Sequence, residues 1–266
     1  MRSQPHGEDH TMRPMSRGLL AGLAAVASVT VQAEIGDAAR GGQPESLFID
    51  KVPTAQGQAT AELIAKALAK GRLVIFGHMG KLTDPKLGDK GFTGDYFMAH
   101  WKATLEPELM GLTPEQKPIL EKLLWAGKQS IDNNQDRLNV KGVGWKNFLP
   151  AKWARETGDL LNTRTGIVTR QPSRAYRHPA NRPDELDRKA LVRATSAGFG
   201  GRPFGEFAMM GKQKVYRYYE PVPLMKPCLA CHGEPKGERD ILGYEKDGLK
   251  EGDVFGLISV AVPVTD

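Results

Sequence analysis

The chain has 266 residues, of which 40% are hydrophobic and 26% charged, and its formal net charge is +6. It is long enough for one large domain or two small ones, and it can bury a core without disulfides. Lys and Arg are interspersed and form no basic block, so nucleic acid is not an expected partner.

The first 33 residues are typical of a bacterial secretory signal peptide. Arg13 and Arg17 precede an apolar run of 13 residues, 19–31, and a small-residue cleavage site ends at Ala33. A membrane span needs roughly 20 apolar residues. We therefore expect a cleaved, exported, periplasmic protein, which would touch a membrane only if this segment stayed as an uncleaved anchor.

The rest of the chain divides at the end of a polar, Gly-rich stretch. Met12 and Met15 are alternative start sites, because the first eleven residues resemble an over-long gene model. Without residues 1–33 the formal charge is +5. Residues 34–56 are expected to be a flexible arm, and residues 57–266 a single domain.

Apolar spacing predicts helices in the first half of this domain. Ala59, Leu63 and Ala67 recur at i, i+4, while the apolar run 73–76 fits either a helical turn or a strand. Thr113 and Pro114 are typical of a helix start. The predicted helices span about 57–78, 95–110, 114–137 and 147–161.

The second half is richer in strands. Short β-like runs occur at 166–169, 204–210, 214–219 and 254–262, with one helix at 184–194. Helices followed by strands predict an α+β fold with an antiparallel sheet, and they argue against a doubly wound parallel sheet.

The most informative segment is Cys228-Leu229-Ala230-Cys231-His232. Two thiols at this spacing can add to the two vinyl groups of one porphyrin, and the following histidine then lies beneath the iron. Pro227 and Gly233 flank the motif as in a loop, whereas a thioredoxin-like CxxC opens a helix. A structural zinc site would need a second Cys or His pair, and the chain has no further Cys.

Export supports the haem interpretation, because covalent haem attachment takes place outside the bacterial cytoplasm. We expect one covalent haem c, with thioether bonds to Cys228 and Cys231 and with His232 as the proximal axial ligand.

Three segments together, in this order, resemble the PAS-like c-type haem domain family, a monohaem group of mostly unknown function. The segments are Ser173-Arg174-Ala175-Tyr176-Arg177-His178-Pro179-Ala180-Asn181-Arg182-Pro183-Asp184-Glu185, Tyr219-Glu220-Pro221 running to Gly233, and Gly243-Tyr244 running through Glu251-Gly252-Asp253-Val254-Phe255-Gly256-Leu257-Ile258-Ser259-Val260. The resemblance is strongest from about 147 to 262.

This resemblance implies a PAS-like antiparallel sheet flanked by helices, with an N-terminal helical region and the haem on a loop near the sheet. Arg177 and Asn181 would brace that loop or contact the haem propionates, and bracing is the simpler role. His178 stands where the family has Asn, and we interpret it as a polar loop residue.

Members of the family often carry a Cys near the end of the first helix as a distal thiolate ligand. This chain has no third Cys, so the distal ligand must differ. His78 lies at about that place and is the first candidate, which would give a low-spin bis-His haem. Met79 and His100 are the competitors, and a helix-end histidine without iron is the alternative role for His78.

Function follows from one haem and no evident catalytic residues. We expect an electron carrier that works with redox partner proteins. A haem-based redox or gas sensor acting through a separate partner is the alternative, on fold analogy alone. A small haem enzyme is the least favoured interpretation, and the sequence gives no indication of oligomeric state.

Overall fold

The computed structural model describes residues 50–143 and 148–265. The predicted signal peptide and residues 34–49 of the predicted arm lie outside these ranges. In the described part of the chain, no helix is long and apolar enough to span a membrane.

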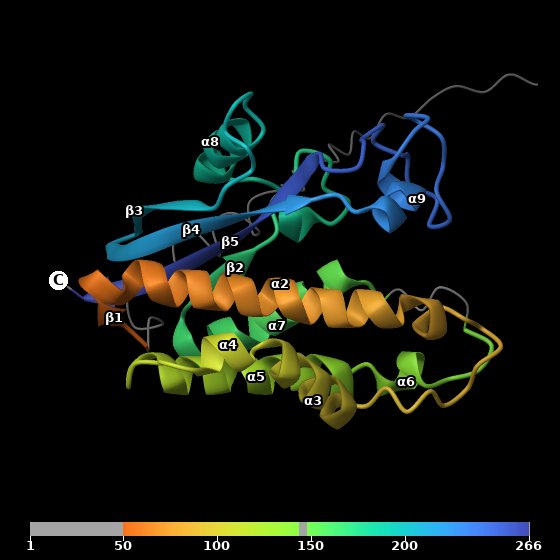
Figure 1. Cartoon of the computed structure of the whole chain (residues 1–266), viewed down its shortest axis with the longest axis horizontal. Helices are drawn as coiled ribbons and strands as arrows, with labels where there is room; N and C mark the ends of the chain where they lie inside the picture. The colour runs from red at the N-terminus through yellow and green to blue at the C-terminus, as the bar shows by residue number, and fades with distance from the viewer. Residues whose placement is uncertain (1–49, 144–147, 266) are drawn as a thin grey trace, which may run out of the picture. The chain divides into compact units, whose positions relative to one another are not determined.

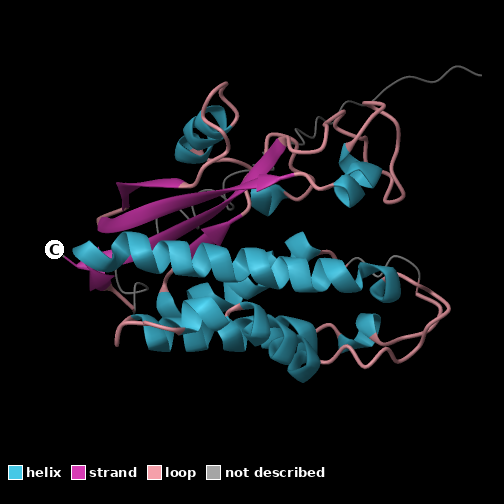
Figure 2. Cartoon of the chain, in the orientation of Figure 1, coloured by secondary structure: helices cyan, strands magenta, loops and turns pink. Residues whose placement is uncertain are grey.

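Helices occupy most of the first half, as Figures 1 and 2 show. In chain order they are α2 (Gly57–Leu82), α3 (Gly94–Thr104), α4 (Glu106–Leu109), α5 (Gln116–Asp132), α6 (Gln135–Leu138), α7 (Pro150–Thr165), α8 (Glu185–Ala194) and α9 (Leu229–His232), with single 3₁₀ turns η2 (Thr54–Gln56), η3 (Pro179–Asn181) and η4 (Lys226–Cys228).

The strands form one mixed sheet in the order β1-β5-β4-β3, with β2 also paired to β5. They are β1 (Val52–Pro53), β2 (Val168–Arg170), β3 (Phe204–Met210), β4 (Gln213–Pro223) and β5 (Val254–Thr265). β2, β4 and β3 pair antiparallel, while β1 runs parallel to β5. Gly211, at φ +60°, lies in the tight turn between β3 and β4, a backbone angle that glycine adopts at no steric cost.

One face of the sheet packs against helices. Alternate residues of β4 and β5, among them Tyr218 and Val260, enter the main core with α2. α7 contacts α2 and β2, and α3 and α5 pack beyond them, so the sheet and two helical layers follow one another (Figure 2).

Two glycines allow the helices of this core to approach closely. A Cβ on Gly71 of α2 would lie 2.1 Å from the ring of Trp153, and one on Gly127 of α5 would lie 2.3 Å from the ring of Trp101. The two indole N–H groups donate to the carbonyls of Gly127 and Ala67. The tryptophans therefore fill the space that the glycines leave open.

The opposite face of the sheet carries α8 and a buried charged cluster. Arg217 of β4 donates to Asp184 and Asp187, which form the capping box of α8. Arg170 of β2 donates to the same Asp184 at 2.7 Å. The ion pairs among these four side chains offset much of the cost of burying them.

The predicted α+β class is confirmed, and three details differ. β1 falls inside the predicted flexible arm, with Val52 fully buried beside β5, so the sheet is mixed and not wholly antiparallel. The helix predicted at 95–110 breaks at Leu105, because Pro107 cannot donate a helical hydrogen bond. The helix predicted at 114–137 ends early, where the Asn134 side chain donates to the Ser130 carbonyl.

Candidate functional site

The Cys228–His232 motif follows directly from the end of β4. The chain leaves the strand at Pro223, makes the 3₁₀ turn η4 around Pro227, and continues into the single turn α9. The Cys228 amide donates to the Met225 carbonyl at 2.8 Å. In Figure 1, α9 and α3 are drawn on opposite sides of α2.

A loop of residues 233–253 folds back onto the motif, and we call it the haem loop after the group that the sequence predicts at the motif. It starts at Gly233, where a Cβ would lie 2.6 Å from the Leu229 carbonyl oxygen. Two backbone hydrogen bonds then join the loop to the motif: Gly248 donates to Gly233 at 3.0 Å, and Leu249 donates to His232 at 2.9 Å. The motif is thus held by its own downstream segment.

His232 is oriented by a carboxylate. Its Nδ1 lies 2.5 Å from Oδ2 of Asp247, and its ring packs on Phe255 at 4.2 Å between centroids. Burial lowers the pKa of His232, although the hydrogen bond to Asp247 opposes this effect. The neutral ring therefore donates its Nδ1 proton to Asp247, and Nε2 keeps a lone pair that can bind a metal.

Arg177 joins the motif to the haem loop. Its guanidinium donates to the Cys231 carbonyl at 2.7 Å and to Asp240 at 2.5 Å. The buried Asp240 also accepts from the amides of Leu242 and Tyr244. Burial alone would raise the pKa of Asp240, but these donors and Arg177 hold it below its usual value. In this geometry Arg177 serves as a brace.

Both cysteines are half-buried and carry free thiols. Burial, together with the charge of Asp240, raises the pKa of the Cys231 thiol above its usual value. Within the described residues, no group of three or more His, Cys, Asp or Glu side chains could hold a metal ion. The zinc alternative therefore finds no ligand set there.

Arg72 of α2 interacts electrostatically with the motif. The charge of Arg72 interacts with Cys228, while burial lowers the pKa of Arg72 to about 10. Beside it on the helix, Leu73 is 52% exposed. At Gly77 and Gly80 an added Cβ would have no atom within 4 Å. Leu73, Gly77 and Gly80 therefore leave part of the surface of α2 open to an apolar group.

His78 lies on another face of α2. Its Nδ1 is 2.8 Å from the Val74 carbonyl oxygen, and its Nε2 is 3.1 Å from the hydroxyl of Tyr96 on α3. The ring also packs against Phe92 and against His100. Both nitrogens of His78 are engaged on the α3 side, and none of these contacts is with the motif.

The two competitors of His78 lie in different places. At 3.6 residues per turn, Met79 is only about 20° around α2 from Arg72, whereas His78 is about 120° away. Met79 is half-buried and packs at the edge of the main core. His100 is exposed on α3, with its Nδ1 2.8 Å from the Tyr96 carbonyl oxygen.

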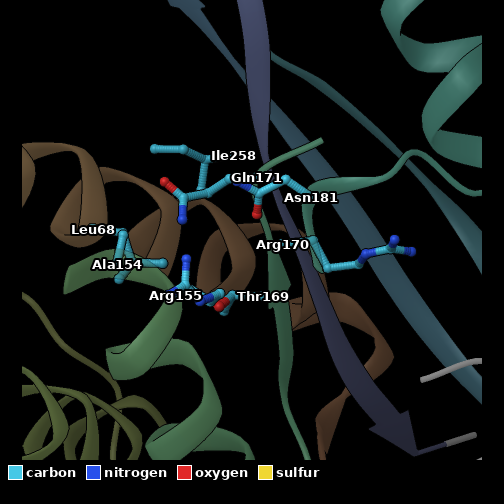
Figure 3. Close-up of a pocket in the computed structure, with 8 residues that line it drawn as sticks. All are labelled: Leu68, Ala154, Arg155, Thr169, Arg170, Gln171, Asn181 and Ile258. Atoms are coloured by element: carbon cyan, nitrogen blue, oxygen red, sulfur yellow. The ribbon is translucent and has the colours of Figure 1, made fainter. Parts of the chain in front are cut away.

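Asn181 and His178 lie in η3 and its N-cap. The side chain of His178 accepts from the Ala180 amide. Asn181 lines a cavity of about 10 Å³ with Arg155 and Gln171 (Figure 3), which is about the space of one water molecule. Among the described residues, the buried Oε1 of Gln171 has no hydrogen-bond partner. Asn181 therefore lines a small cavity of mixed polar and apolar character and not the motif.

A larger cavity, of about 200 Å³, lies on the α8 face of the sheet. Met209 and Met210 line it together with Arg170, Asp184 and Arg217. Arg170, Asp184 and Arg217 belong to the paired cluster described above, and Glu185 also lines the cavity. Neither cavity includes a residue of the motif.

The sequence offers little signal for three residues of this site. Asp247 and Asp240 are two acids among several in a polar loop, and only the folded loop distinguishes them. Arg72 reads as an ordinary charged residue of a helix. Asp240 and Asp247 both lie within about twenty residues of the motif, but so do other acidic residues. The sequence alone therefore does not distinguish these two from the others.

Comparison with known proteins adds a family. The crystal structure of the cyanobacterial haem protein Tll0287 is 20% identical to the chain, covers 57% of it and 97% of its own length, and superposes with a TM-score of 0.40. No curated protein matches the chain. The model of the Tll0287-like family matches residues 58–263. Because this match spans most of its length, the chain belongs to the Tll0287-like family.

Proposed function

We propose that this protein is an exported, periplasmic c-type haem protein with a PAS-like domain, which carries single electrons between redox partner proteins. One haem would be attached through thioethers to Cys228 and Cys231, with His232 as the proximal ligand. The haem iron supplies a site that can take up and release one electron.

The observation that carries the proposal is the state of His232. A histidine that binds iron needs a free nitrogen on one side and a hydrogen-bond acceptor on the other. His232 follows a CxxC and donates Nδ1–H to Asp247 at 2.5 Å. Within the described chain its Nε2 has no partner. The donor set therefore fits a haem c.

Helix geometry favours Met79 over His78 as the sixth ligand. Met79 lies about 20° around α2 from Arg72, whose charge interacts with Cys228. His78 would have to leave the Val74 carbonyl or the Tyr96 hydroxyl before it could ligate. The thioether of Met79 would stabilise ferrous iron and raise the reduction potential relative to bis-His ligation.

Covalent attachment is tested by expressing the full chain in a bacterium that matures c-type cytochromes. We expect haem that stays bound after denaturation, at one per chain and in the periplasmic fraction. Cys228→Ser with Cys231→Ser should abolish the attachment. Cytoplasmic protein, or haem that dissociates on denaturation, would contradict the proposal.

A redox titration then separates carrier from sensor. A carrier should titrate as a single reversible one-electron centre, and its ferrous form should bind CO and NO slowly or not at all. Rapid CO or NO binding to the ferrous protein would instead support the gas-sensor alternative.

A further inference from the structure

The carboxylate of Asp247 is fixed against His232 by the fold of the haem loop. The two residues that follow Asp247 are held by backbone hydrogen bonds, from Gly248 to Gly233 and from Leu249 to His232. Gly248 has φ +74°, and a Cβ there would lie 2.7 Å from the Cβ of Lys236. The turn that places Asp247 therefore requires glycine.

The pair is also shielded from water. The side chains of His232 and Asp247 are 19% and 14% exposed, and Phe255 covers the imidazole. A hydrogen bond to a carboxylate is stronger in such surroundings than in water. It is also stronger than the hydrogen bond that a neutral carbonyl would accept.

One cation moderates this carboxylate. An Nη2 of Arg177 lies 3.8 Å from Oδ2 of Asp247, too far for a direct hydrogen bond. The Arg177 guanidinium instead donates hydrogen bonds to Asp240 and to the Cys231 and Glu245 carbonyls. Asp247 therefore keeps its acceptor capacity for His232.

From this geometry we infer that Asp247 is a positioning residue that sets the reduction potential of the iron. By accepting the hydrogen bond from Nδ1–H it increases the electron donation of Nε2, which favours ferric over ferrous iron and lowers the potential. The inference rests on the proposed haem site and adds a tuning residue to it.

The test is a redox titration of the haem-loaded protein and two variants. Asp247→Asn removes the charge and keeps the shape. Asp253→Asn removes the same charge from an exposed side chain of the same loop. We expect Asp247→Asn to shift the ferrous-to-ferric ratio at fixed solution potential at least tenfold toward ferrous, or about 59 mV for one electron. Asp253→Asn should shift it far less.

The outcomes separate the two proposals. A wild-type chain without covalent haem defeats the proposed function, whereas covalent haem with equal shifts in both variants overturns only the role of Asp247. If Asp247→Asn takes up no haem, Asp247→Glu decides. Asp247→Glu keeps the charge, so its ferrous-to-ferric ratio at fixed solution potential should differ from that of the wild type by less than tenfold. A larger shift toward ferrous would overturn the inference.

Discussion

His232 and His78 show how surroundings assign different roles to the same side chain. One ring nitrogen of His232 is hydrogen-bonded to a carboxylate and the other has no partner among the described residues, whereas both nitrogens of His78 are hydrogen-bonded, to a carbonyl and a hydroxyl. A ligand needs an available lone pair, and a helix-packing histidine needs satisfied polar atoms. By this criterion His78 joins α2 to α3.

At the residue scale, we predict that Met79→Ala and His78→Ala have different effects on the haem spectrum. Met79→Ala should remove the ferric thioether-to-iron charge-transfer band and lower the reduction potential, because methionine ligation raises it. His78→Ala should leave the spectrum unchanged and destabilise the fold by about 1 kcal/mol through lost contacts with α3. Visible spectra and urea unfolding measure both effects.

The reverse pattern would restore the bis-His assignment. Loss of the low-spin spectrum in His78→Ala, with Met79→Ala unchanged, would mean that His78 rotates away from Tyr96 in the haem-loaded protein. An unchanged spectrum in both variants would exclude both residues as ligands.

The sequence predicts the part of the site whose chemistry is local. Cys228, Cys231 and His232 are recognisable because the porphyrin fixes their spacing. Asp247 is fifteen residues further on, and only the pairing of the haem loop with Gly233 brings it to His232. The sequence gives the angular positions of residues around α2, but it does not tell which side of the helix lies near the motif. It therefore cannot decide between His78 and Met79 as the distal ligand.

Among the described elements, α2 packs on both the sheet and the other helices of the core. It packs on β4 and β5, on α7, and on α3 and α5. Its glycines have two different uses: Gly71 admits Trp153 into the core, while Gly77 faces open space. The same substitution should therefore have opposite effects at the two positions.

At the element scale, we predict that Gly71→Ala lowers the free energy of unfolding by about 2 kcal/mol. The methyl group would lie 2.1 Å from the ring of Trp153, and overpacking outweighs the gain of about 1 kcal/mol in helix propensity. Gly77→Ala is the matched control and should raise stability, by up to about 1 kcal/mol. Equal shifts in urea unfolding would show that propensity alone governs α2.

The strands illustrate where periodicity succeeds and where it fails. β4 and β5 are predictable because each is long and carries many buried residues, whereas β3 buries only Met210. β1 is not predictable, because two residues carry no period, and Val52 is recognisable only from its pairing with Val264. A parallel strand of only two residues, such as β1, forms because of tertiary packing and not because of a local sequence pattern.

For the domain as a whole, the motif and α2 reach each other through few described contacts. Arg72 interacts with Cys228 through its charge, and the adjacent face of α2 leaves Leu73 half exposed. A large apolar group attached at Cys228 and Cys231 would lie next to this face. Attachment should therefore couple the haem loop to α2, which in turn is coupled to the sheet.

We predict that covalent haem slows amide hydrogen exchange in two separate segments, the second half of α2 and residues 225–253. The reason is that burial of an exposed apolar face raises the free energy of local opening. The comparison is between the haem-loaded wild type and Cys228→Ser with Cys231→Ser, measured by exchange and mass spectrometry. Peptides from α5 and α7 serve as the internal control, because their tryptophan contacts are already buried. Slower exchange confined to residues 225–253 would show that the haem loop carries the cofactor without α2. Slower exchange in both segments would mean that the attached haem stabilises α2, the helix at the centre of the fold, as well as the haem loop.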